Sequence, residues 1–241
     1  MSEPEHSADP AETSVAGGLS PDDMTDGEIN FLWSFIQGSI VIPETWNALL
    51  RGYGFCERHA WIHLNVEMAF RDDYLLGPTI LYGELIAQSV RAVETRRRHS
   101  AVPHLRASGP CLLCAANVRN APAGACPPAR LARARDTSAL RRFTLALQPF
   151  WQDLPCPCCA SVAVSAGSCR CRQHLLAAAK AGAPIDFSAQ LTMLHKLSER
   201  LSRYENSFLA GGLKAGDRDR AALLAAVGWC SGWRPLLAQI L

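Results

Sequence analysis

The sequence predicts an all-α protein, an irregular helical bundle stapled by one or two Cys/His zinc sites. Apolar residues recur every three or four positions along most of the chain, which is the helical period, and strand-like alternation is nearly absent. Ten cysteines include two CxxC and two CxxH pairs, a spacing typical of zinc ligands. At 241 residues the chain is long enough for one large domain or two small ones.

The most informative stretch reads CPCCASVAVSAGSCRCRQH and holds five of the ten cysteines. Cys156 and Cys159 form a CxxC pair, and Cys171 and His174 form a CxxH pair at the start of a predicted helix. Three thiolates and one imidazole suit a tetrahedral Zn²⁺ ion. Because four protein ligands leave no open position, we expect a structural site that supports folding rather than a catalytic one.

A second constellation of the same type lies upstream. Cys56 and His59 form a CxxH pair in GFCERHAWIHL, and Cys111 and Cys114 form a CxxC pair in CLLCAANV. The economical pairing assigns these four residues to one ion, across a loop of more than fifty residues. The alternative is that they are ordinary buried cysteines, which often behave as small apolar residues. Four paired motifs argue against that alternative for the set.

Three further residues are spare ligands in this interpretation. His59, His63 and Glu67 lie four residues apart on one side of the helix predicted after Cys56, so one hypothesis makes them a metal-binding stripe. The interpretation we favour makes His63 a core histidine that hydrogen-bonds to Glu67. Cys158 and Cys169 are the other two cysteines of the CPCC…CRCRQH stretch. Ligand pairs that use either of them would need tighter turns than the two-residue gaps of CxxC and CxxH, so we do not expect them to be obligatory ligands. The spare ligands are therefore His63, Cys158 and Cys169.

Charge is distributed unevenly along the chain. Residues 1–28 contain eight acidic and no basic residues, so the rest carries 24 basic and 14 acidic residues, a formal charge of +10. Such a body could attract an anionic surface. We favour a solubilising, disordered acidic leader over residues 1–26. Ten cysteines without an N-terminal signal pattern predict a reducing, cytoplasmic location, and no apolar run is long enough to span a membrane.

The predicted domain organisation has three parts: the leader at 1–26, a helical region at 27–150 with the first metal site, and a zinc-stapled helical region at 151–241. In the second part, INFLWSFIQ predicts a helix, and Pro43 begins the next one. The helix after Cys56 is apolar on nearly every face, which predicts a central position. A further helix runs from Pro78 to about Arg96.

The C-terminal half follows the same reasoning. We expect a loop over 120–136, which is rich in Ala, Pro and Arg and contains Cys126. An amphipathic helix over 137–148 should stop at Pro149. The ASVAVSAG run suits a short hairpin or a loop. Apolar residues from Phe187 to Phe208 predict one long amphipathic helix, and residues 216–228 and 231–240 predict two final helices.

Three phrases carry a family resemblance: GFCERHAW, CPCC followed by CRCRQHL, and RYENSF with the later GWCSGWRPLL. They resemble an uncharacterised bacterial family of helical, presumed zinc-binding proteins with paired CPxC and GFCxxH motifs. The resemblance implicates Cys56 with His59, Cys156 with Cys159, and Cys171 with His174 as zinc ligands. The family has a further CPxC near its N-terminus, which this chain lacks before Cys56. Either Cys111 and Cys114 complete the first site, or it stays incomplete, open and reactive.

Each ligand set has four protein ligands and no open position, and the chain has no recognisable catalytic motif. These two observations predict a structural zinc protein with a partner-binding or regulatory role. The chain has no nucleotide-binding loop, GxSxG or HExxH motif. The partner we expect is a protein; nucleic acid is less favoured, because the basic RRRHSAVPHLR run has no interleaved aromatic residues. One alternative is a metal-dependent enzyme or biosynthetic accessory protein with an open first site and His63 or Glu67 as acid–base. Another is a thiol-based metal or redox sensor that reacts at Cys126, Cys158, Cys169 or Cys230.

Overall fold

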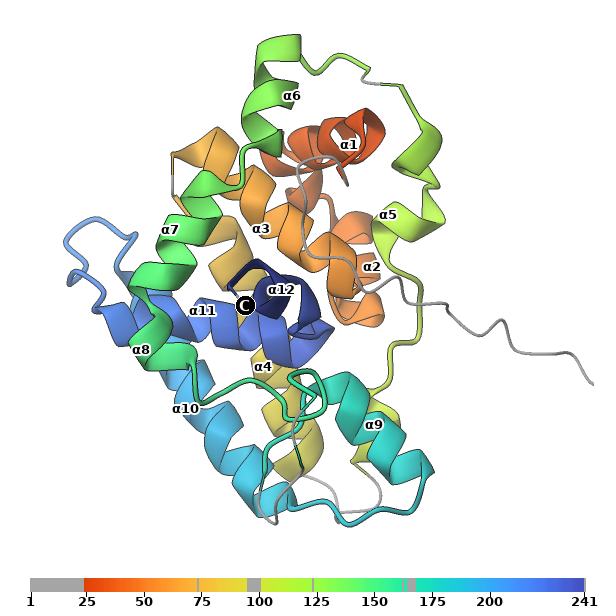
Figure 1. Ribbon diagram of the computed structural model, residues 1–241, viewed down its shortest axis with the longest axis vertical. Coiled ribbons are helices and arrows are strands. Elements are labelled where there is room, and N and C mark those ends of the chain that lie inside the picture. The colour runs from red at the N-terminus through yellow and green to blue at the C-terminus, as the bar shows by residue number, and fades with distance from the viewer. Residues whose placement is uncertain are drawn as a thin grey trace, which may run out of the picture.

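The computed structural model describes residues 24–72, 74–94, 101–122, 124–161, 163 and 168–240. Helices dominate these residues, and none of them forms a strand, which confirms the all-α prediction (Figure 1). Three predictions lie wholly or mainly outside the described residues: the disordered leader, the helix end near Arg96 and the conformation of ASVAVSAG. Within the described part of the chain, no helix is long and apolar enough to cross a membrane.

The first two helices form where the sequence predicts them. α1 (Asp26–Gln37) begins at a capping box formed by Thr25 and Glu28 and buries its apolar stripe. α2 (Pro43–Gly52) begins with its proline in the first turn. It ends at Tyr53, which adopts the left-handed conformation with φ of 57°, and Gly54 follows at φ of 80°. This turn delivers the chain to Cys56.

Two helices that are buried all round form the centre of the molecule. α3 (Glu57–Arg71) buries every residue from His59 to Ala69, as its apolar sequence predicts. α11 (Asp217–Ser231) buries every residue from Ala221 to Ser231, and it contacts α3, α4, α8, α9 and α10. The small residues of α11 allow this close packing: a Cβ on Gly228 would lie 2.3 Å from the ring of Trp233.

The longest helices pack against α11 and against each other. α4 (Leu76–Glu94) lies along α10 (Phe187–Asn206), and both contact α11. The Asp186 carboxylate caps α10 by accepting hydrogen bonds from the backbone N–H groups of Ser188 and Ala189. The predicted long amphipathic helix is confirmed, and its apolar stripe is core.

Shorter elements complete the fold, and two predictions in this region are wrong. The expected loop over 120–136 contains α6 (Pro128–Arg135), because Pro128 is preset for a first helical turn and Leu131 and Ala134 are buried at helical spacing. Pro149 does not stop a helix; it lies near the start of α8, where its missing N–H costs nothing.

The other short elements are α5 (Leu112–Ala115), α7 (Ser138–Ala146), α8 (Gln148–Trp151), α9 (Arg172–Lys180) and α12 (Arg234–Ile240), with 3₁₀ turns at Ser39–Val41, Val102–Leu105 and Val118–Asn120.

Candidate metal centres

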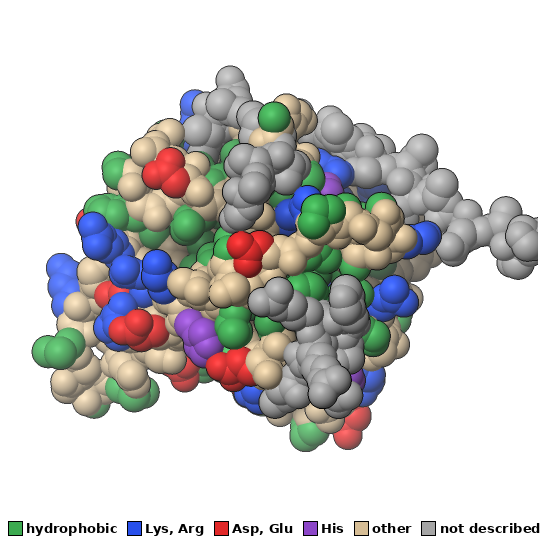
Figure 2. Space-filling view, turned by 90° about the horizontal axis from the view of Figure 1, so that it is seen from below, with side chains coloured by type: hydrophobic (Ala, Val, Ile, Leu, Met, Phe, Trp, Pro, Cys, Tyr) green, Lys and Arg blue, Asp and Glu red, His purple; other side chains and the backbone are tan. Residues whose placement is uncertain are grey.

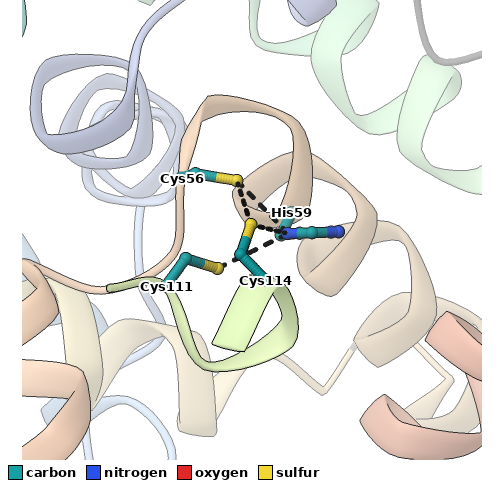
Figure 3. Close-up of side chains that lie close together, drawn as sticks. All are labelled: Cys56, His59, Cys111 and Cys114. Carbon is teal, nitrogen blue, oxygen red and sulfur yellow. Dashed lines mark hydrogen bonds between the residues drawn. The ribbon is translucent and has the colours of Figure 1, made fainter. Parts of the chain in front are cut away.

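The first cluster forms where two helix N-termini meet. Cys56 is the N-cap residue of α3 and His59 lies in its first turn; Cys111 is the N-cap residue of α5, which carries Cys114. Figure 3 shows the three sulfurs gathered around one edge of the imidazole. His59 Nδ1 lies 3.2 Å from the sulfur of Cys56 and 3.4 Å from each of the other two sulfurs. The sulfurs of Cys56 and Cys114 lie 3.8 Å apart.

The second cluster repeats this arrangement at the start of α9. Cys171 is the N-cap residue of α9, His174 lies in its first turn, and the turn from Cys156 to Cys159 faces them. His174 Nδ1 lies 3.1 Å from the sulfur of Cys171, 3.4 Å from that of Cys159 and 3.5 Å from that of Cys156. The sulfurs of Cys159 and Cys171 lie 3.7 Å apart.

Both clusters match the dimensions of a tetrahedral metal site. Zn–S bonds of about 2.3 Å and Zn–N bonds of about 2.0 Å give tetrahedral edges of roughly 3.8 Å between sulfurs and roughly 3.5 Å between sulfur and nitrogen. The distances above lie close to these edges. In each cluster all four donor atoms lie within 4.8 Å of one another, so either group could hold a metal ion. The structure thus brings together both sets of four residues that the sequence pairs.

Within each cluster, hydrogen bonds between sulfurs favour the ionisation of one cysteine and oppose that of its partner. In the first cluster, the hydrogen bond from Cys56 lowers the pKa of Cys111 to about 3, and the same bond raises the pKa of Cys56. In the second, hydrogen bonds from Cys159 and Cys171 lower the pKa of Cys156, whereas the bond to Cys156 raises the pKa of Cys171. A divalent cation would allow all three thiols of each cluster to ionise together.

A buried carboxylate orients the histidine of the first cluster. Glu28 is fully buried, and its Oε1 lies 3.0 Å from His59 Nε2, on the side of the ring away from the sulfurs. Arg58 donates to both oxygens of this carboxylate, at 3.2 Å and 3.1 Å, and the Thr25 N–H donates at 2.9 Å.

These contacts decide which ring nitrogen of His59 faces the cluster. Burial alone would raise the pKa of Glu28, but hydrogen bonds from His59, Thr25 and Arg58 lower it to about 2. The ionised carboxylate accepts a hydrogen bond from Nε2–H of His59, which leaves the lone pair of Nδ1 available to a metal ion.

The histidine one turn further along α3 differs from the expectation. His63 is fully buried, packed against the rings of Phe35 and Phe55, and neither of its nitrogens has a hydrogen-bond partner among the described residues. Burial lowers its pKa to about 3, so the ring is neutral. The expected hydrogen bond to Glu67 is absent because aromatic rings flank the imidazole. Glu67 lies against Gly77 instead, and burial raises its pKa to about 7.

The remaining cysteines lie outside the two groups of four. Cys158 and Cys169 are half-buried, and Cys126 and Cys230 are buried. His63, Cys158 and Cys169 therefore do not belong to either compact donor set. Sequence reasoning did not single out Cys114 within its set, yet it is the one cysteine of the ten that is exposed. Nothing in the CLLC motif distinguishes its two sulfurs; only the packing of α5 does.

Comparison with known proteins adds no relative. No protein-family model matches the chain, and no curated protein or solved structure matches it either. The resemblance to a bacterial zinc-binding family therefore rests on the quoted motifs alone.

We predict that Glu28→Gln weakens metal binding at the first cluster by roughly 10- to 100-fold, the range typical of residues that orient a ligating histidine. The second cluster should be unaffected, because it shares no contact with Glu28. Competition with a chromophoric chelator would measure both sites. Glu57→Gln is the matched control: Glu57 also neighbours Cys56, but its carboxylate pairs with Arg234, and among the described residues it forms no hydrogen bond to a donor atom of the cluster. Equal losses in the two variants would contradict an orienting role.

Proposed function

We propose that the protein binds two Zn²⁺ ions, one at each Cys₃His cluster, and that both ions are structural. The observation that carries this proposal is the agreement of the donor–donor distances with a tetrahedron of zinc dimensions in both places. Three thiolates and an imidazole also suit zinc among the common divalent metals, because soft sulfur donors in tetrahedral geometry select it. Four protein donors in each set leave no position for a reactive water, which disfavours the enzyme alternative.

Residues beside the first cluster support a structural role. Phe55 and Glu57 flank Cys56, and both contact the junction between α11 and α12. The Ser231 hydroxyl donates to the carbonyl of Phe55 at 3.0 Å, and the Arg234 N–H donates to the Glu57 carboxylate at 3.1 Å. One turn on, the Trp61 indole N–H donates to the carbonyl of Gly232 at 2.9 Å.

Residues beside the second cluster contact the same junction from another side. Arg172 follows Cys171 directly; its guanidinium is buried and donates to the carbonyls of Cys230 and Leu105, each at 3.0 Å. Gln173 donates to the carbonyl of Ser231 at 3.0 Å.

The end of the central helix α11 is thus held by residues adjacent to both proposed zinc sites. Structural zinc contributes roughly 10–16 kcal/mol in small peptides, as much as the whole stability of a typical domain.

We propose a protein as the partner, and an open groove between α8, α10 and α11 favours an acidic segment of it. The groove has a volume of about 280 Å³, with Phe150 and Leu197 among its apolar walls. Lys196, Arg200 and Arg218 line it, and no acidic residue does. Arg200 pairs with Asp219 at 3.6 Å, but Lys196 and Arg218 form no ion pair within the described part of the chain. An apolar side chain flanked by carboxylates complements this lining.

Nucleic acid remains the less favoured partner. On the face shown in Figure 2, basic side chains are densest toward one edge, others are scattered over the rest of the face, and acidic side chains lie among them. Arg203 and Arg220, on α10 and α11, are paired with Asp219 and Asp217. Interspersed charges of both signs reduce the continuous positive field that phosphate backbones require.

We predict two zinc ions per chain by elemental analysis of protein never exposed to chelator. Cys158→Ser and Cys169→Ser should each keep both ions, because neither sulfur belongs to a compact donor set. Cys171→Ser should lose one. Retention of zinc in Cys171→Ser together with loss in Cys158→Ser or Cys169→Ser would show that the ligand register at the second site is wrong.

We predict that stripping zinc with a strong chelator removes amide-exchange protection over 171–182 and at the C-terminal end of α11. The reason is that the Arg172 and Gln173 contacts to residues 230 and 231 depend on the start of α9. Hydrogen exchange with mass spectrometry would measure this, and circular dichroism would follow the lost helicity. Addition of zinc to the stripped protein is the control for reversibility. Unchanged protection after zinc removal would rule out a structural role there.

We predict that the groove binds an anionic apolar dye such as anilinonaphthalene sulfonate to the zinc-loaded protein, measured by fluorescence titration. Lys196→Glu should weaken binding about two- to fivefold, the scale of one exposed charge pair. Lys214→Glu is the matched control, since this exposed lysine lies outside the groove lining and changes the net charge equally. If the two variants bind the dye equally, the groove does not select anions.

A further inference from the structure

We propose that Cys114 is an oxidative modification site, at which a hydroperoxide attacks the first cluster and releases its metal. The inference rests on the proposed binding of zinc at that cluster. It goes beyond a structural role, because it assigns a reaction to one of the two sites and none to the other. The inference is based on the different solvent exposure of the donor atoms in two clusters that have the same three sulfurs and one nitrogen.

The two clusters expose opposite donors. In the first, His59 and Cys111 are buried, Cys56 is half-buried and Cys114 is exposed. In the second, all three cysteines are buried and only the imidazole of His174 is half-exposed. Thiolates remain nucleophiles when they bind metal, and oxidation follows thiolate character and exposure. Zinc would make the sulfurs of both clusters thiolates, so exposure is what distinguishes them.

The surrounding elements explain this difference in exposure. Cys114 lies on α5, a helix of four residues in which only Leu113 is buried, at the edge of the molecule (Figure 1). Cys171 instead begins α9 beside the buried guanidinium of Arg172, and Cys159 lies close to Trp233 in the α11–α12 junction. A peroxide can therefore approach one sulfur of the first cluster but none of the second.

A resolving thiol is in place beside Cys114. The sulfur of Cys56 lies 3.8 Å away, and Cys56 is half-buried. The Cys114 thiolate attacks a peroxide oxygen: an S–O bond forms, the O–O bond breaks and hydroxide leaves. The Cys56 thiolate then attacks the resulting sulfenic acid: an S–S bond forms, and a second hydroxide leaves.

The electrons balance without any change at the metal. The two thiolates lose two electrons, and the peroxide gains them; two protons from solvent convert the hydroxides to water. Zinc has no redox chemistry and keeps its charge throughout. A zinc ion at this cluster would keep only His59 and Cys111 as protein ligands and would dissociate, because the disulfide removes Cys56 and Cys114 from the donor set.

The other cysteines do not offer the same chemistry. Cys126 and Cys230 are buried, which shields both from the oxidant. Cys158 and Cys169 are half-buried and lie outside the donor sets, so a bound ion does not hold them as thiolates. These two are nevertheless the most accessible cysteines that are not ligands, and they supply the controls.

The test treats the full, zinc-loaded chain with one to five equivalents of hydrogen peroxide. A chromophoric zinc indicator follows the release of metal, and peptide mass spectrometry maps the oxidised cysteines. We expect one of the two zinc ions to be released, at least tenfold faster than the other, together with a Cys56–Cys114 disulfide. Cys158→Ser and Cys169→Ser should leave this rate unchanged. Brief labelling of the untreated protein with N-ethylmaleimide should modify Cys114 first.

The outcomes separate this inference from the proposed function. Two zinc ions before treatment, followed by release of both at equal rates or by oxidation first at Cys156, Cys159 or Cys171, would overturn the inference and keep the two structural sites. Loss of peroxide sensitivity in Cys158→Ser or Cys169→Ser would also overturn it. If only the second cluster holds zinc before any oxidant is added, both the inference and the proposal of two sites fail.

Discussion

The rest of this structure depends on two compact clusters of side chains. Each cluster has three thiols and one imidazole, and its donor atoms lie about as far apart as the ligands of a tetrahedral zinc ion. Without a cation, ionisation of one thiol opposes ionisation of its neighbour: the pKa of Cys111 is lowered while that of Cys56 is raised, and the pKa of Cys156 is lowered while that of Cys171 is raised. A divalent ion would remove that opposition and would join segments that lie far apart in the chain. The first cluster links α3 to α5 across more than fifty residues, and the second links a turn to α9.

Both clusters use the same local device. In each, a CxxH pair begins a helix, with the cysteine at the N-cap position and the histidine in the first turn, so that its Nδ1 points back toward the sulfur. Neither cysteine makes the side-chain hydrogen bond that an N-cap residue usually provides. The residues that follow each cysteine then contact the α11–α12 junction. A metal bound at either cluster would therefore be coupled to the central packing through a helix start, although no residue of the junction belongs to a donor set.

Much of this could be predicted from the sequence, because its strongest signals are local. CxxC and CxxH spacings act within one turn, and the apolar periodicities of α1, α3 and α10 act within one helix. The central position of α11 was harder to predict, because its burial depends on small residues that accept neighbours from every side. α6 was missed because prolines and arginines resemble loop composition, while Leu131 and Ala134 supply a stripe of only two residues.

The environment of each donor could not be predicted at all, because it depends on contacts between distant segments. Glu28 reaches His59 from another helix, thirty-one residues earlier in the chain. His63 looked like a hydrogen-bonded residue from its spacing to Glu67, but the rings of Phe35 and Phe55 decide its surroundings.

The same limit explains why two identical donor sets need not behave alike. Ligand identity selects the metal, and tertiary packing decides which donor meets solvent. One cluster carries its histidine inside against a carboxylate and a cysteine outside on a four-residue helix; the other reverses this order. A buried imidazole oriented by Glu28 favours retention of a bound ion. An exposed thiolate instead favours reaction of the sulfur with an oxidant from solvent. Both features meet in the first cluster, so an ion bound there would have a well-oriented histidine ligand and a solvent-accessible thiolate ligand at the same time.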